Sequence, residues 1–270
     1  LGHNVDFISS SVGDEVEQAL QEPTRKEPLF LLENVRFHKG EKENSEDFAR
    51  MLAKPFDVYI NDAFSVCHRD QASVTNIAKY LPAFAGLHLQ EEINTLSDVE
   101  NSPEKPAVAI IGGAKIETKL PMLRMFEKLY DTVLVGGRIA NEALDAKDRK
   151  ENSLVFSKNV LFPVDFVGDR FDIGQKTVKL FSEKIHGAKT IIWNGPMGKF
   201  EEKRYSNGTD AVTREIVKSG AFSVVGGGES LEALEKNGLL GKFSFVSTGG
   251  GALLAFLGGD VMPGLEVLKK

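Results

Sequence analysis

The sequence predicts an α/β protein built from two doubly wound parallel-sheet domains. Short apolar runs alternate with amphipathic helical stretches along almost the whole chain, and most of these runs end in glycine. Continuous Val/Ile runs are typical of strands buried on both faces, as in a parallel sheet covered by helices. The expected strands are residues 4–8, 56–64, 107–114, 131–137, 160–167, 189–195, 221–228 and 243–251.

The length of the chain and one charged helical stretch suggest how it is divided. A chain of 270 residues favours about two domains, at roughly 100–200 residues each. Residues 87–101 are expected to form a helix that joins two domains, although a routine crossover helix fits the same pattern.

Composition excludes several classes of protein. The formal net charge of −6 lacks the basic footprint of a nucleic-acid binder. The single Cys67 rules out an intrachain disulfide and fits a reducing, cytoplasmic location. No apolar run reaches the ~18–20 residues needed to cross a bilayer. The first residues lack the charged n-region and the long apolar stretch of a signal peptide. They also lack an initiating Met, so we expect a fragment or a truncated form.

Glycines follow many of the expected strands, at Gly112–Gly113, Gly136–Gly137, Gly195, Gly226–Gly228 and Gly249–Gly251. Because the carboxyl ends of parallel strands share one edge of a sheet, these glycines would line that edge with backbone N–H groups. A nucleotide or another phosphorylated ligand is the favoured interpretation, and tight-turn sterics are the alternative. Neither the dinucleotide fingerprint nor the Walker A loop occurs, which disfavours an NAD-linked oxidoreductase.

Two lysines follow the first glycine pair. Lys115 and Lys119 are expected at positions i and i+4 on one face of the next helix, where two cations repel each other unless an anion lies close by. Solvated surface lysines are the alternative. The position directly after a Gly-Gly strand end favours contact with phosphate.

Other polar residues are concentrated in a few short motifs. "WNGPMGKFE" brings together Asn194, Pro196 and Glu201, of which Glu201 could bind a ribose hydroxyl. In the first third of the chain, Arg36 and Arg69 each follow an apolar strand, where arginine can bind phosphate or carboxylate bidentately. His38, His68 and Cys67 match no standard zinc spacing.

Taken in order, "LLENVRFHKGE", "NDAFSVCHRDQAS", "GGAKIETKL", "WNGPMGKFE", "GGGES" and "STGGGALLAFLGGDVMPGLEVL" resemble the motifs of phosphoglycerate kinases. The resemblance covers residues 1–270. It implies an incomplete N-terminal, glycerate-binding domain at 1–86, an interdomain helix at 87–101, a nucleotide-binding domain at 102–256 and a C-terminal segment at 257–270 that returns towards the first domain. It implies a hinge-bending, monomeric, cytoplasmic enzyme of glycolysis that transfers a phosphoryl group between 1,3-bisphosphoglycerate and ADP, giving 3-phosphoglycerate and ATP. It also implies Mg²⁺, carried with the nucleotide.

The resemblance implies a role for each matching residue. Arg36 and Arg69 would bind the glycerate substrate, and Lys115, Lys119 and Gly250 would lie at the transferred phosphoryl group. Glu229 would bind Mg²⁺, directly or through water. The residues implied in nucleotide binding are Gly112, Gly113, Lys119, Gly136, Gly137, Phe171, Asn194, Pro196, Glu201, Gly227, Gly228, Glu229 and Ser230.

The sequence departs from the family's pattern in ways that leave a second function open. The family's opening segment, with part of its glycerate site, does not precede Leu1 in this sequence. Glu229 stands where the family has Asp, Arg138 replaces the third glycine of a triple, and Arg170–Phe171 replace a Gly-Leu beside the adenine. The alternative is therefore a catalytically impaired relative that binds Mg-nucleotide and lacks half the glycerate site.

Overall fold

The computed structural model describes residues 2–21, 28–149 and 155–269. The chain divides into two compact units, which are described separately below. Unit 1 contains Leu1–Gln90 together with Met262–Lys270, and unit 2 contains Glu91–Val261. Unit 1 is therefore assembled from two stretches of chain that are separated by the whole of unit 2. Among the described residues, no helix has both the length and the apolar character needed to cross a bilayer.

Unit 2 is built on a six-stranded, fully parallel sheet with the order β12-β11-β10-β5-β6-β7. The strands are β5 (Ala107–Ile111), β6 (Thr132–Val135), β7 (Val160–Leu161), β10 (Thr190–Asn194), β11 (Phe222–Gly226) and β12 (Phe245–Ser247). From the central pair β5 and β10, the chain progresses to one edge through β6 and β7 and to the other through β11 and β12. This reversal confirms the predicted doubly wound α/β fold.

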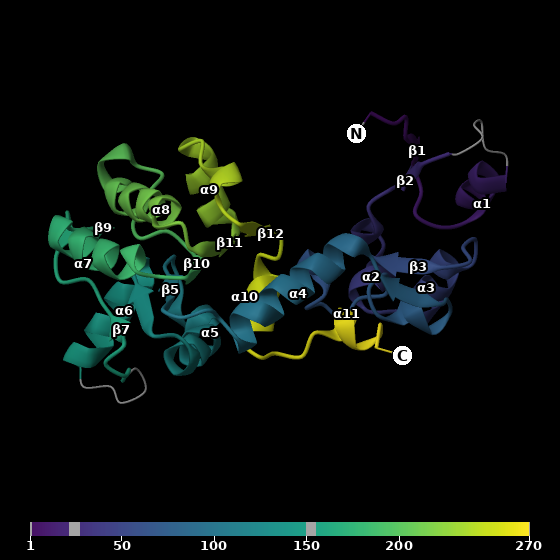
Figure 1. The fold of residues 1–270 in the computed structure, drawn as a ribbon. Coiled ribbons are helices and arrows are strands. Elements are labelled where there is room, and N and C mark those ends of the chain that lie inside the picture. Colours follow the sequence, from purple (N-terminus) through teal and green to yellow (C-terminus); the bar gives the residue numbers. More distant parts are fainter. Residues whose placement is uncertain (1, 22–27, 150–154, 270) are drawn as a thin grey trace. The chain divides into compact units, whose positions relative to one another are not determined.

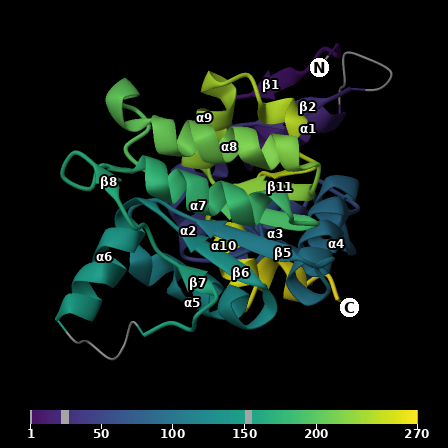
Figure 2. The same ribbon diagram turned by 60° about the vertical axis from the view of Figure 1, so that its left-hand side comes forward.

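Helices cover both faces of this sheet (Figures 1 and 2). One face carries α7 (Gln175–His186), α8 (Asn207–Ser219) and α9 (Gly228–Lys236), and the other carries α5 (Ile116–Leu129), α6 (Gly137–Asp148) and α10 (Gly251–Leu257). Every residue of β5 and β10 is buried as a result. Helix α4 (Leu87–Asn101) has the bounds predicted for it.

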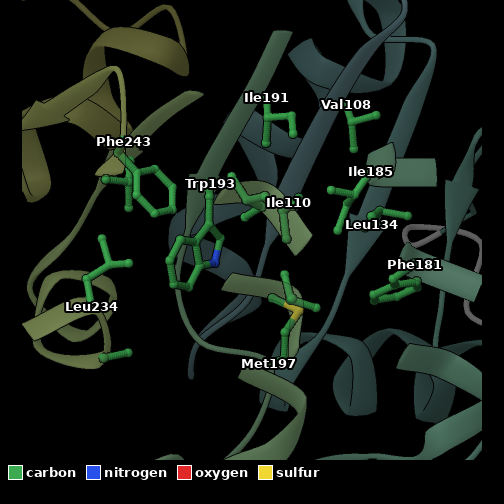
Figure 3. Close-up of a cluster of buried hydrophobic side chains, with 14 of the residues drawn as sticks. Val108, Ile110, Leu134, Phe181, Ile185, Ile191, Trp193, Met197, Leu234 and Phe243 are labelled. Carbon is green, nitrogen blue, oxygen red and sulfur yellow. The ribbon is translucent and has the colours of Figure 1, made fainter. Parts of the chain in front are cut away.

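One large hydrophobic cluster of unit 2 lies between the sheet and the first of these helix layers. Trp193 on β10 is completely buried and packs among Ile110, Met197 and Phe243, its ring centroid lying 5.9 Å from that of Phe243 (Figure 3). The indole Nε1–H donates to the carbonyl oxygen of Gly195 at 2.7 Å. The largest core side chain therefore also fixes the turn that follows its own strand.

One predicted strand is wrong. Residues 160–167 form two short strands, β7 and β8 (Phe166–Val167), and β8 pairs in antiparallel fashion with β9 (Asp172–Ile173) outside the main sheet. Pro163 lies between them, and proline has no N–H to donate to a central ladder. Because most of residues 160–167 are apolar, their composition did not indicate that the strand is interrupted.

Unit 1 carries two separate two-stranded parallel sheets. They pair β1 (Asp6–Ile8) with β2 (Phe30–Leu32), and β3 (Tyr59–Asn61) with β4 (Ala83–Ala85). The described helices of this unit are α1 (Asp14–Gln21), α2 (Lys39–Lys42), α3 (Glu46–Ala53) and α11 (Pro263–Glu266), together with the first residues of α4. Gly264 of α11 donates its N–H to the Cys67 carbonyl oxygen at 2.9 Å. The C-terminal segment of the chain therefore packs against the loop that follows β3.

Candidate functional site

The candidate site of unit 2 lies at the carboxyl ends of β5 and β10, where the strand order reverses. Ligands of open α/β sheets bind at this position. The two strand ends are tied together, since Gly112 N–H donates to Asn194 O and Gly113 N–H donates to Pro196 O, both at 2.9 Å. Gly137, at the start of α6, completes the edge by donating its N–H to Met197 O at 2.8 Å.

Glycine is required at this edge because backbone segments approach so closely. A Cβ on Gly112 would lie 2.0 Å from Pro196 O, and a Cβ on Gly137 would lie 2.7 Å from Gly113 N. Gly137 also has a φ of 62°, in the region that favours glycine. A Cβ on Gly136 would lie 2.5 Å from the sulfur of Met197. These glycines therefore shape the edge, and the predicted gathering of strand ends is observed.

Lys119 is buried against this edge, with 8% of the residue exposed. Its Nζ donates to Gly112 O at 2.6 Å and to Asn194 O at 3.5 Å. Burial lowers the pKa of Lys119 to about 8, and the nearby Glu229 carboxylate opposes that shift. A buried cation held only by backbone carbonyls and one carboxylate would be stabilised further by an incoming anion.

Lys115 takes a different position from the one predicted. It is the N-cap of α5, in an extended conformation and exposed, and the helix begins only at Ile116. The expectation that Lys115 and Lys119 share one helical face is therefore wrong. The strand-end turn continues one residue further than the 3.6-residue pattern suggested, which leaves one lysine at the surface and the other in the interior.

Glu229 lies in the first turn of α9 and is exposed. A Cβ built on Gly113 would lie 3.3 Å from Glu229 Oε2 and 3.0 Å from Lys119 Nζ. The carboxylate of Glu229 and the amine of Lys119 therefore both lie beside Gly113. The described residues contain no cluster of three or more metal-ligating side chains. A single carboxylate suits Mg²⁺ that arrives with phosphate oxygens and water, since Mg²⁺ is commonly held by one or two carboxylates plus substrate phosphates.

Asn194 and Ser230 are used inside the protein. Asn194 Nδ2 donates to Gly226 O at 2.9 Å, and Ser230 Oγ, which is fully buried, accepts from Gly195 N at 2.7 Å. Gly227, with a φ of 96°, is the N-cap of α9, and Gly228 is its first residue. These residues join the ends of β10 and β11 to α9 and so fix the position of Glu229 in the first turn of that helix.

A pocket of about 620 Å³ opens beside this edge. Its lining residues are Gly113, Ala114, Gly137, Arg138, Asn141, Glu142, Asp145, Asp169, Arg170, Phe171, Pro196, Gly198, Lys199, Glu201 and Glu229. The predicted site residues Gly113, Gly137, Phe171, Pro196, Glu201 and Glu229 are thus brought together in one cavity. The predicted Gly112, Lys119, Asn194 and Ser230 are not among its lining residues.

One group of lining residues was not predicted from the sequence. Arg138, Asn141, Glu142 and Asp145 all belong to α6. Their spacing of three, four and seven residues places them on one helical face, directly after the Gly136–Gly137 strand end. That spacing was the signal that could have revealed them.

The far end of the pocket is suited to an aromatic ring. Phe171 is 43% exposed and its ring lies 5.0 Å from that of Tyr205. Arg170 has a φ of 57° and pairs with Asp145, Nη1 to Oδ1 at 2.6 Å. Next to them Asp172 is buried, accepting from Ile173 N at 2.9 Å and Gly208 N at 2.8 Å, and burial raises its pKa to about 6. Asp172 therefore holds together the loops at this end.

Gly250 is the N-cap of α10 and has a φ of 45°. The turn before it is held by Glu92 of α4, whose Oε1 accepts from both N and Oγ1 of Thr248, at 2.6 and 2.8 Å. A Cβ on Gly250 would meet no atom within 4 Å. The space beside the Cα atom of Gly250 is therefore open.

Unit 1 contains a cluster of basic residues. Arg36 lies in the short 3₁₀ turn 35–37 after β2 and is exposed, while His68 and Arg69 follow β3. Burial lowers the pKa of His68, and the charges of Arg69 and Arg36 lower it further. His68 Nδ1 and Arg69 Nε are buried without a hydrogen-bond partner in the described structure. Sequence reasoning predicted the two arginines, and the structure adds His68.

Comparisons with known proteins agree with this geometry. The family model described as phosphoglycerate kinase matches residues 1–165 and 163–260. The chain belongs to the phosphoglycerate kinase family. It is 38% identical over 310 residues to the phosphoglycerate kinase of Moorella thermoacetica, an alignment covering 100% of this chain and 79% of that protein. It is 40% identical to the enzyme of Rubrobacter xylanophilus, covering 100% and 78%.

Solved structures of phosphoglycerate kinases share the fold. The crystal structure of the Pyrococcus horikoshii enzyme matches with a TM-score of 0.86 at 30% identity, over 98% of this chain and 78% of the other. The structure of the Coxiella burnetii enzyme matches with a TM-score of 0.78 at 35% identity, over 90% of this chain and 72% of the other. The resemblance stated from the motifs is therefore confirmed.

Proposed function

We propose that this chain catalyses the phosphoryl transfer of its family, between 1,3-bisphosphoglycerate and ADP, giving 3-phosphoglycerate and ATP. The observation that carries the proposal is the buried Lys119, held at a glycine-lined strand edge beside a pocket large enough for a nucleotide. Phosphoryl transfer leaves little covalent chemistry to the protein, so positioning and charge stabilisation are the main tasks of such a site.

The nucleotide would occupy the pocket of unit 2 with its phosphates towards Gly113 and Gly137. Phe171 would contact the base and Glu201 a ribose hydroxyl, with Pro196 forming the wall between the two ends. Mg²⁺ would reach the site with the nucleotide and neutralise charge on its phosphate oxygens, and Glu229, whose carboxylate lies beside Gly113, would hold it. Gly112, Gly136, Asn194, Gly227, Gly228 and Ser230 would act by shaping these positions.

Lys119 would stabilise the phosphoryl group during transfer. With a pKa of about 8, most Lys119 side chains carry a proton at pH 7, and phosphate oxygens nearby would raise that fraction. Lys115, exposed at the N-cap of α5, is free to contact a phosphate chain. Gly250, at the N-terminus of α10, would allow close approach of the transferred group.

The glycerate substrate would bind to the basic cluster of unit 1. Arg36 and Arg69 can each bind a carboxylate or phosphate bidentately, and the buried Arg69 Nε–H, which has no hydrogen-bond partner in the described structure, favours an anion. The chain would then consist of an N-terminal domain at 1–86, an interdomain helix at 87–101, a nucleotide domain at 102–256 and a returning segment at 257–270. The two domains would bend about a hinge during catalysis. The protein would be monomeric and cytoplasmic.

A coupled assay with Mg-ATP and 3-phosphoglycerate tests the proposal. We expect turnover by the native chain and a loss of ~10²–10³-fold in kcat for Lys119→Ala, with a smaller change in nucleotide affinity. Lys128→Ala, on the exposed face of the same helix, is the matched control and should leave kcat unchanged. Binding of Mg-ADP without turnover and without 3-phosphoglycerate binding would instead identify an impaired relative.

A further inference from the structure

Arg138 lines the nucleotide pocket and has no role in the function proposed above. It is the second residue of α6, directly after Gly137, and its side chain is 74% exposed. This places it at the end of the pocket where Gly113, Gly137 and Glu229 meet. The pocket's other described arginine and lysine, Arg170 and Lys199, lie at the Phe171 end, where they pair with Asp145 and Glu202.

The guanidinium of Arg138 is paired with a carboxylate that already performs another task. Arg138 Nε lies 3.2 Å from Glu142 Oε1, and the second oxygen of Glu142, Oε2, accepts from Ile116 N at 3.1 Å. Ile116 is the first residue of α5, and its N-cap, Lys115, supplies no side-chain acceptor. Glu142 therefore adds a negative charge at the N-terminus of α5, where Glu117 of the first turn already carries one.

The N-terminus of a helix is a favourable position for an anion, because free N–H groups and the helix dipole both attract negative charge. In this structure the Glu142 carboxylate holds that position, and Arg138 neutralises it from the pocket side. An ion pair between partly exposed side chains contributes little to stability, so exchanging its anion costs little. A nucleotide phosphate offers more charge and several oxygens in a geometry that matches guanidinium.

We propose that Arg138 binds the phosphate chain of the nucleotide, exchanging its ion pair with Glu142 for the incoming phosphate oxygens. Glu142 keeps its hydrogen bond to Ile116 N and opposes nucleotide binding through its charge. Since the ligand is taken to be a nucleotide, the assignment rests on the proposed function. Arg138 is then a substrate-binding residue, and Glu142 is its counter-ion in the free protein.

Breaking the same ion pair from its two sides gives a decisive experiment. Calorimetry would measure binding of Mg-ADP and of adenosine, which lacks phosphates, to the native chain, Arg138→Gln and Glu142→Gln. Glutamine at 142 keeps an oxygen that can accept from Ile116 N, so the cap of α5 is retained. We expect Arg138→Gln to weaken Mg-ADP binding about tenfold and Glu142→Gln to strengthen it several-fold, with adenosine binding unchanged in both.

Matched controls use an ion pair of similar kind outside the pocket. Lys218 Nζ lies 2.8 Å from Glu215 Oε1 on α8, and Lys218→Gln and Glu215→Gln change the net charge by the same amounts. Neither should alter Mg-ADP affinity, and melting temperatures should stay close to native for all four variants.

Changes of the same sign in Arg138→Gln and Glu142→Gln would overturn the assignment, because an ion pair that only supports the fold is lost equally from either side. Equal losses of Mg-ADP and adenosine binding in Arg138→Gln would overturn it too, since a phosphate contact cannot act on adenosine. Native Mg-ADP affinity in Arg138→Gln would contradict the role of Arg138 alone. Absence of Mg-ADP binding by the native chain would contradict the proposed function itself.

Discussion

The two units use parallel strands under very different conditions of burial. In unit 2 every residue of β5 and β10 is buried, and helices cover both faces of the sheet. In unit 1 the paired residues Phe7 and Leu31 are each 59% exposed, and Ile60 and Phe84 are 62% and 57% exposed. Parallel strands are ordinarily covered on both faces. The candidate pocket of unit 2 therefore lies at the edge of a sheet whose central strands are fully buried, whereas the basic cluster of unit 1 follows strands that are partly exposed.

The largest effect expected from this comparison is on folding stability in unit 2. Trp193→Ala removes the largest fully buried side chain and its hydrogen bond to Gly195 O. We expect a loss of ~3–5 kcal/mol in the free energy of unfolding, measured by urea denaturation. A loss below about 1 kcal/mol would mean that the core of unit 2 is no better packed than the strands of unit 1.

A smaller effect is expected where the backbone approaches itself at the strand edge. Gly112→Ala places a Cβ 2.0 Å from Pro196 O, so one of the two segments must move. We expect ~1–3 kcal/mol of destabilisation together with weaker Mg-ADP binding.

Gly187→Ala is the control for this substitution. Gly187 follows α7 with a φ of −92°, and a Cβ there would meet no atom within 4 Å. It should change neither quantity. If Gly112→Ala behaved like Gly187→Ala, the close tie between β5 and β10 would not be needed for the site.

The next prediction concerns pH and the loops at the Phe171 end of the pocket. Burial raises the pKa of Asp172 from 3.8 to about 6, so the folded state binds more protons than the unfolded state between these values. The contribution of Asp172 to stability is therefore full below about pH 4 and is lost as the pH rises to about 6. Asp172→Asn should remove this part of the pH dependence in urea titrations. An unchanged profile would show that Asp172 titrates normally.

The smallest effect is expected on the exposed face of unit 1. Ile60→Ser replaces a side chain that is 62% exposed, so the free energy of unfolding should change by less than about 0.5 kcal/mol. Thermal unfolding compared with Ala109→Ser, a fully buried position on β5, measures the contrast directly. A large loss from Ile60→Ser would show that this face is covered in solution.

The strands of unit 2 were predictable because they are continuous apolar runs that end in glycine. Glycine is needed at these ends because two backbone segments approach each other closely there. Gly112 and Gly137 illustrate this, since side chains would collide at both positions. The break at Pro163 and the position of Lys115 outside α5 were not predicted, because apolar composition and helical spacing say little about where an element begins or ends. The pocket face of α6 was missed because charged residues on a helix ordinarily face solvent.

The division of unit 1 between two stretches of chain has a consequence for the order of synthesis. Gly264 packs where a Cβ would lie 2.9 Å from the Cα of Cys67, so unit 1 needs residues that are translated after the whole of unit 2. All of unit 2 is therefore translated before the contacts that α11 makes in unit 1 can form. Domains generally fold as units during synthesis. Unit 2 should therefore be able to fold during synthesis before unit 1 has all of its residues.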